Sequence, residues 1–186
     1  MPKQHTENLF GIISDLFEES GMSFEKLDGV AVAVGPGSYT GVRLACSVAQ
    51  GIAFSHDIKA VTLSSLELLS LEAHRTLGLE RINCISAANQ GKVYVAESSF
   101  VDGDILTKMK LIDQESILRE SFPENSHFIG EGCELFQFEN QLRDGQPRAS
   151  LLLEVAEVRF SKGNCIEAES ILPIYFNDEN SWKKII

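Results

Sequence analysis

The chain has 186 residues, enough for one domain or two small ones with a hydrophobic core. Hydrophobic residues make up 44% of it, but no apolar run is long enough to span a bilayer, which argues against a membrane protein. The 27 acidic and 16 basic residues give a net charge of −11, and no basic run is present. Because Lys and Arg clusters bind phosphate backbones, the chain is a poor candidate for binding tRNA unaided.

The four cysteines, Cys46, Cys84, Cys133 and Cys165, are scattered and form no C-x-x-C pair. This spacing predicts reduced, buried thiols rather than a disulfide framework or a zinc site. No signal-peptide pattern opens the chain. We therefore expect a cytoplasmic protein.

The first predicted element is an amphipathic helix over residues 5–19. Its apolar stripe consists of Leu9, Ile12, Ile13, Leu16 and Phe17. We expect most of this stripe to pack against the chain's own sheet. His5 at the helix start is typical of a capping or surface residue and is weak evidence for a metal or for catalysis.

Residues 30–54 form the central pattern of the chain: a strand at residues 30–34, a glycine-rich turn at residues 35–41 and a helix from Gly41. A phosphate-binding P-loop would need Lys and Ser/Thr after its last glycine, and here Val42 and Arg43 follow Gly41. The glycine spacing also differs from the Rossmann pattern. The residues alone therefore favour a tight turn over a phosphate site.

The helix over residues 41–54 is rich in small residues: Gly41, Ala45, Ala49, Gly51 and Ala53. Small side chains let another backbone approach closely. Packing within the chain explains them as readily as association with a partner does.

A second strand is predicted at residues 59–63, and Ser64 is a helix cap for residues 65 to 74 or 77. A boundary follows near Gly78. Beyond it, alternating patterns predict strands at residues 82–85, 92–96, 105–112 and 127–130, with short helices near 113–120 and 133–138 and a longer helix at 151–160. Lys108 and Lys110 indicate a half-exposed edge. Trp182 in the charged tail either anchors a partner or packs back on the domain.

Five stretches resemble one protein family. GPGSYTGVRLACSVAQGIA, beginning at Gly35, is similar to the signature of the TsaB (YeaZ) family, which serves bacterial threonylcarbamoyladenosine (t6A) tRNA modification. QHTENL, VTLSSLELLS, GKVYVA and PIYFNDENSWKK, beginning at Gln4, Val61, Gly91 and Pro173, match it in the same order. The resemblance covers essentially the whole chain. It also relates the chain to the Gcp-like, peptidase M22-like proteins.

The resemblance implies an α/β fold of the actin-like ATPase (ASKHA, RNase H-like) class with two related lobes. We expect an N-terminal lobe at residues 1–78 and a C-terminal lobe at residues 79–186. Family members normally begin with a three-strand meander, so the first lobe is expected to be incomplete. Residues 30–34 would then form an unprotected sheet edge, which favours lowered stability and pairing with another chain.

The resemblance further implies a non-catalytic subunit that forms a heterodimer with the catalytic relative TsaD. The complex would transfer a threonylcarbamoyl group to N6 of adenosine 37 in tRNAs that read codons beginning with A. TsaE is a further expected partner, self-association is an alternative, and tRNA is bound only through the complex. The expected partner contacts are His5, Leu9, Ile12, Ile13, Leu16, Gly35, Pro36, Gly37, Ser38, Tyr39, Thr40, Gly41, Arg43, Ala45 and Ala49.

TsaD carries two metal-binding histidines one helical turn apart where this chain has Ser65 and Leu69. Neither residue is a suitable ligand, so we expect no metal and no catalytic residue. No cofactor is expected on the chain alone; ATP or ADP at the interface of the complex is left open. The chain also has Ala87-Ala88-Asn89 where the family usually has Asp-Ala-Arg, and any contact made by those charged residues is lost or altered.

Two other functions remain. One is an enzyme of the same fold, a peptidase or a nucleotide-dependent phosphotransferase. A metallopeptidase would need a motif such as H-E-x-x-H, which is absent. The other is a homodimeric scaffold that uses the same helices.

Overall fold

The computed structural model describes residues 4–119, 122–123, 125–142, 145–174 and 183–184. Its longer helices are α1 (Gln4–Ser20), α2 (Tyr39–Ser55), α3 (Ser65–Leu77) and α4 (Ala149–Ser161). Short 3-10 helices are η1 (Phe24–Lys26), η2 (Gln114–Arg119), η3 (Glu131–Leu135) and η4 (Ala168–Ser170). The strands are β1 (Gly29–Ala33), β2 (Lys59–Leu63), β3 (Arg81–Ala87), β4 (Lys92–Val101), β5 (Asp104–Asp113), β6 (Phe128–Ile129), β7 (Gln141–Leu142) and β8 (Lys183–Lys184).

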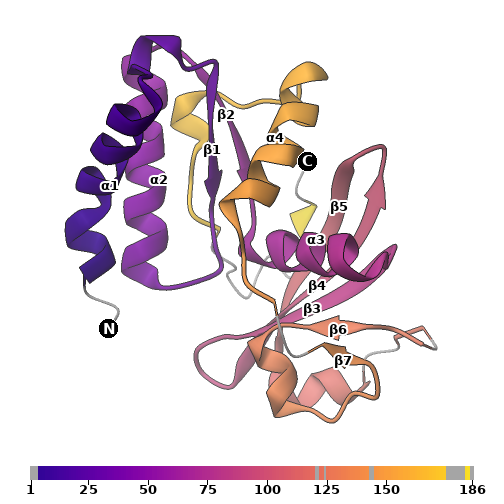
Figure 1. Ribbon diagram of the computed structural model, residues 1–186. Coiled ribbons are helices and arrows are strands. Elements are labelled where there is room, and N and C mark those ends of the chain that lie inside the picture. Colours follow the sequence, from indigo (N-terminus) through magenta and orange to yellow (C-terminus); the bar gives the residue numbers. More distant parts are fainter. Residues whose placement is uncertain (1–3, 120–121, 124, 143–144, 175–182, 185–186) are drawn as a thin grey trace.

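The smaller sheet consists of the parallel strands β1 and β2 (Figure 1). One face packs on α2, where Val32, Val34 and Ala60 meet Cys46, Ala49 and Ala53. The other face packs on α4, where Val61 and Leu63 meet residues such as Leu152 and Val155. Strand residues alternate between the two faces, which is why a run of small apolar residues is buried on both sides.

The larger sheet has the strand order β7-β6-β3-β4-β5-β8. Strands β3, β4 and β5 form an antiparallel meander, and β6 pairs parallel to β3. Helix α3 covers one face with Leu66 and Ala73, and the opposite face holds a cluster that includes Ile117, Phe128 and Cys133. Lys110 is buried on β5, with 4% of its surface exposed, so the half-exposed edge predicted there holds for Lys108 only.

The C-terminal third of the chain returns to the smaller sheet. Besides α4, the segment before η4 pairs with β2, because Ala60 and Ile166 exchange two backbone hydrogen bonds of 2.9 and 2.8 Å. The N–H of Ile174 donates to the carbonyl oxygen of Val34 at 2.9 Å. The predicted division of the chain at residue 78 therefore needs correction, since residues 149–174 belong with the first lobe.

Strand β1 has β2 on one side, and the described residues place no strand on its other side. The N–H of Val34 donates to Leu63, so alternation along the strand directs the N–H and C=O groups of Ala31 and Ala33 to the open side. The expected open edge is therefore present in the described part of the chain. Association through this edge stays a prediction.

Most predicted elements agree with the structure, including the strand at residues 59–63 and the helices α1, α2 and α4. Residues 133–138 were predicted to be helical, but η3 ends at Leu135. Trp182 and most of the predicted tail lie outside the described residues. No helix in the described part of the chain is both long and apolar enough to cross a membrane.

Candidate functional site: an uncovered helical face and a neighbouring cleft

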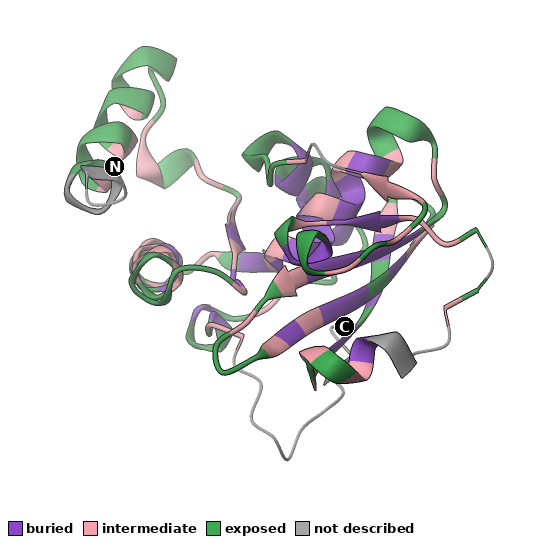
Figure 2. Cartoon of the chain, turned by 90° about the horizontal axis from the view of Figure 1, so that it is seen from below, coloured by how far each residue is buried: buried purple, intermediate pink, exposed green. Residues whose placement is uncertain are grey.

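Helix α1 presents apolar side chains that the described protein leaves uncovered. Phe10, Ile12 and Leu16 are 68%, 46% and 59% exposed. Figure 2 shows α1 standing apart from α2 and the sheets, with mostly exposed residues along its length. Both faces of the smaller sheet are already occupied by α2 and α4, so no sheet surface is left for α1. The expectation that its stripe packs on the chain's own sheet is therefore wrong for Ile12 and Leu16.

The remaining predicted contacts on α1 differ in their environment. Leu9 and Ile13 are partly covered, and their spacing of three or four residues from Ile12 and Leu16 places all four on one side of the helix. The side chain of His5 lies outside the described part of the chain. Four of the five predicted α1 contacts therefore share one side of the helix, and their contact with a partner stays a prediction, as does that of His5.

Helix α2 has a buried face and an exposed face. Ala49 is 5% exposed and packs in the cluster with Val32 and Val34, and Ala45 packs against the same cluster. The prediction that Ala49 contacts a partner therefore needs correction: this small residue allows close helix–sheet packing within the chain. The exposed residues, spaced three or four apart on one side of α2, are Thr40, Arg43, Ser47, Gly51 and Phe54.

The glycine-rich turn links this helix to α3. Gly35 is buried with φ of +95°, a conformation that favours glycine, and its carbonyl oxygen accepts a hydrogen bond of 2.8 Å from the N–H of Ser65. Gly35 is thus a turn residue rather than a partner contact. The peptide bond between Gly35 and Pro36 is cis. Ser38 caps α2 by accepting a hydrogen bond from the N–H of Gly41.

Residues 37–41 and Arg43 are exposed, so the structure brings most of the predicted turn contacts to the surface. The Arg43 guanidinium lies 3.8 Å from the centre of the Tyr39 ring, a cation–π arrangement. Pro36 is half-buried and lines the cleft described next.

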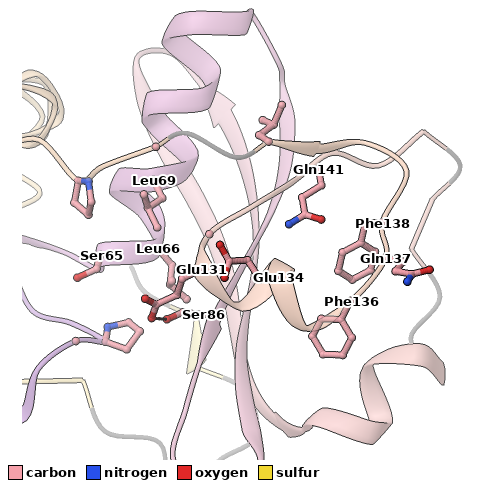
Figure 3. A pocket seen from close by; sticks show the side chains of 16 residues that line it. Ser65, Leu66, Leu69, Ser86, Glu131, Glu134, Phe136, Gln137, Phe138 and Gln141 are labelled. Atoms are coloured by element: carbon pink, nitrogen blue, oxygen red, sulfur yellow. Dashed lines mark hydrogen bonds between the residues drawn. The ribbon is translucent and has the colours of Figure 1, made fainter.

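A cleft of about 940 Å³ separates the glycine turn and α3 from the loops of the larger sheet (Figure 3). Pro36 and Gly37 line it from the turn, Ser65 and Leu69 from α3, and Glu131 and the loop that follows it from the other side. Gly130 lets η3 approach β3, because a Cβ atom there would lie 2.3 Å from the carbonyl oxygen of Ile85. Ser65 and Leu69, which stand where TsaD is expected to carry histidines, therefore line this cleft.

The described lining of the cleft is acidic. The Glu131 and Glu134 side chains lie on the same side of the cleft, and Ser86 Oγ donates a hydrogen bond of 3.2 Å to Glu131 Oε1 (Figure 3). None of the described lining residues is Lys, Arg or His. A phosphate group here would approach two carboxylates without a neighbouring cation from these residues. In the described part of the chain no three His, Cys, Asp or Glu side chains are placed to hold a metal ion.

A buried charged cluster joins the two sheets. Arg159 Nε donates to Asp104 Oδ1 at 3.0 Å, and its Nη1 donates to the Thr62 carbonyl oxygen at 3.0 Å. Glu67 Oε1 lies 3.9 Å from Arg159 Nη2. Burial raises the pKa of the Glu67 carboxyl against the opposing effect of hydrogen bonds from Ser64. This cluster was missed in the sequence, where Arg159 fits the period of α4 but carries no sign of burial.

Three of the four cysteines are buried within the chain. Cys46, Cys84 and Cys133 are buried, as expected, whereas Cys165 is only partly covered. Burial raises the pKa of Cys133 to about 12 and that of Cys84 well above its usual value. These thiols are protonated at neutral pH and are therefore poor nucleophiles.

Comparison with known proteins identifies the chain's relatives. Residues 1–138 match the family model described as TsaD, tRNA N6-adenosine threonylcarbamoyltransferase. A tRNA threonylcarbamoyladenosine biosynthesis protein TsaB from Haemophilus influenzae is 26% identical over 98% of this chain and 84% of the relative. The TsaB of Escherichia coli is 27% identical over 99% of this chain and 85% of the relative.

The catalytic relatives match a shorter part. A tRNA N6-adenosine threonylcarbamoyltransferase from Bradyrhizobium diazoefficiens is 36% identical over 93 residues, which are 50% of this chain and 26% of that protein. Among solved structures, YeaZ from Pseudomonas aeruginosa superposes with a TM-score of 0.82 at 28% identity, covering 95% of this chain and 86% of the other. The expected α/β fold of the actin-like class is thereby confirmed. The chain therefore belongs to the TsaB (YeaZ) branch of the family that the TsaD threonylcarbamoyltransferase model describes.

Proposed function

We propose that this chain is the partner subunit of a t6A-forming complex. It pairs with TsaD and supports transfer of the threonylcarbamoyl group to N6 of adenosine 37 in tRNAs that read codons beginning with A. Two relatives over nearly its full length are named as t6A biosynthesis proteins. The partial match to threonylcarbamoyltransferases supports descent from the same fold as the proposed partner.

The observation that carries this proposal is the uncovered apolar side of α1. Ile12 and Leu16 lie one turn apart and are both largely exposed. An exposed apolar side chain gains about 1.5–3 kcal/mol when a partner buries it fully. With the exposed face of α2, which includes Phe54 at 76% exposure, α1 supplies the kind of apolar contacts that a stable subunit interface uses.

The chain contributes recognition rather than chemistry in this proposal. Its cleft has Ser65 and Leu69 at the positions expected to bind metal in TsaD, and carboxylates where a nucleotide would need cations. The net charge of −11 assigns the tRNA contacts to other subunits. TsaE is a further pathway partner, and ATP or ADP binds, if at all, where subunits of the complex meet.

The test is a matched pair of substitutions on α1. Leu16→Glu places a charge on the exposed apolar side, and Ser14→Glu places the same charge on the opposite, exposed side of the helix. We expect Leu16→Glu to weaken binding to TsaD by at least about tenfold, because losing the burial of one leucine costs about 1.5–3 kcal/mol of binding free energy. Ser14→Glu should bind like the parent chain. The affinities are measured by titration calorimetry with purified TsaD.

The same variants are then placed in a TsaB-deficient strain, with the t6A content of its tRNA as readout. The parent chain and Ser14→Glu should restore t6A, and Leu16→Glu should restore less. If the parent chain neither binds TsaD nor restores t6A, the proposed function is wrong. A concentration-dependent dimer of the chain alone, disrupted by Leu16→Glu, would instead favour the homodimeric scaffold.

A further inference from the structure

A column of three rings in contact, one pair tilted and one stacked, connects α1 to the C-terminal end of α2. The Phe17 and Phe24 rings have centroids 4.1 Å apart and an interplanar angle of 37°. Phe24, in η1, stacks in turn on His56, with centroids 5.5 Å apart and an angle of 25°. The separation of Phe24 and His56 lies within the range of about 4.5–7 Å that attractive ring pairs prefer, and Phe17 and Phe24 lie slightly closer.

The ring at the end of this column is held on α2. His56 is the residue after the last turn of α2, and its Nδ1 lies 2.8 Å from Ser55 Oγ and 3.1 Å from the carbonyl oxygen of Ile52. These contacts fix the ring to the helix that packs on the smaller sheet. The His56 ring is therefore fixed relative to α2 and the smaller sheet.

The ring at the other end is held on α1. Gly21, with φ of +63°, ends the helix, and its N–H donates to the carbonyl oxygen of Glu18. Phe17 lies in the last turn of α1, so its contact with Phe24 fixes the end of the helix nearest the turn. The rest of α1 stands out from the body in Figure 2.

We propose that the column formed by Phe17, Phe24 and His56 positions α1 relative to α2 and so pre-forms the two-helix surface that the partner binds. The partner-binding part of this inference rests on the proposed function. Phe24 and His56 are then positioning residues that need no contact with the partner. A helix held in its binding orientation avoids the entropy cost of being ordered on association.

The orientation is tested in the chain alone. Spin labels are attached at Ser14→Cys on α1 and Ser47→Cys on α2, both exposed, in a Cys165→Ser background; the other three cysteines are buried. Pulsed electron–electron double resonance then gives the distribution of distances between the two spin labels. We expect Phe24→Ala to broaden the distribution and Phe24→Tyr, which keeps the ring, to preserve it. Phe10→Ala, which removes an exposed ring outside the column, should leave it unchanged.

The consequence for binding is measured on unlabelled chains. Phe24→Ala and His56→Ala should each weaken binding to TsaD by up to about tenfold, the range that an aromatic pair supports. Phe24→Tyr should restore the parent affinity. Melting temperatures of the Phe24→Ala and His56→Ala chains equal to that of the parent would show that these variants remain folded.

A distance distribution that Phe24→Ala leaves unaltered would overturn the inference, and so would an unaltered affinity. If the parent chain fails to bind TsaD, the proposed function fails. The distance measurement still decides whether the column positions α1.

Discussion

At the scale of single residues, Arg159 shows how a buried charge is accommodated. The side chain is 7% exposed and bonds the Asp104 carboxylate and the carbonyl oxygens of Thr62 and Ile105. Thr62 is on β2 and Ile105 is on β5, so one guanidinium bonds strands of both sheets. A buried cation is tolerated only when such acceptors replace its water.

Arg159→Met should therefore destabilise the chain strongly. Methionine keeps much of the volume but leaves the Asp104 and Glu67 carboxylates without their cation, and breaking a buried ion pair in this way costs about 3–5 kcal/mol. Urea unfolding measures the change in the free energy of unfolding. The control is Arg75→Met, because Arg75 pairs with Glu154 on the surface, and such pairs contribute at most about 1 kcal/mol. Equal losses in the two variants would contradict the role given to Arg159.

At the scale of secondary-structure elements, the start of α3 is fixed by a complete capping box. Ser64 Oγ accepts a hydrogen bond of 3.0 Å from the N–H of Glu67, and the N–H of Ser64 donates to Glu67 Oε2 at 2.6 Å. Ser64 is fully buried, so water cannot replace a lost partner. The cap matters beyond the helix, because α3 lines the cleft and its first N–H bonds the glycine turn.

Ser64→Ala should lower the free energy of unfolding by about 1–2 kcal/mol, the usual cost of losing an N-cap. Ser65→Ala is the matched control, since it removes a hydroxyl from the next residue and keeps the Ser65 N–H that bonds Gly35. Its effect should stay within about 0.5 kcal/mol. Both values come from urea unfolding, and a larger loss for Ser65→Ala would show that the cap does not govern this helix start.

Helix α1 and strand β1 each have a surface that the described part of the chain leaves uncovered. The apolar side of α1 and the outer edge of β1 both lack a neighbour in the described part of the chain. Exposed features of this kind favour association. For α1 the partner is proposed to be TsaD, and for β1 the association of copies stays a prediction.

At the scale of the whole molecule, two sheets meet at a cleft of about 940 Å³ whose described lining carries two glutamates and no Lys, Arg or His. Clefts between packed units are preferred ligand sites in proteins, so the charge of this cleft bears on whether the chain binds a nucleotide. Two carboxylates with no cation among the other described lining residues repel a triphosphate.

We predict that the isolated chain does not bind ATP with a dissociation constant tighter than about 1 mM, equivalent to about −4 kcal/mol. Titration calorimetry with MgATP measures this. The double variant Glu131→Gln, Glu134→Gln serves as the comparison. Because it removes both carboxylates, it should bind ATP at least as tightly as the parent chain does. Tight binding by the parent chain, or ATP turnover, would contradict the prediction and favour the phosphotransferase alternative.

The sequence by itself determined the local structure and the family. Alternation and helical spacing located the strand at residues 59–63 and the helices α1 and α4, because these periods follow from backbone geometry. Ser64 and Gly35 were readable as a cap and a turn because their roles depend on a few adjacent residues. The loop and tail motifs resembled one family, and the relatives confirm it.

Only the tertiary structure decided which surface each apolar residue meets. The family resemblance implied that Leu16 and Ala49 alike contact a partner, yet Leu16 is exposed and Ala49 is buried. Burial of Arg159 and the return of residues 149–174 to the first sheet depend on groups distant in the chain. A sequence pattern specifies that a side chain is apolar or charged, whereas long-range packing specifies what lies against it, and that packing places the open face of α1 and the cleft.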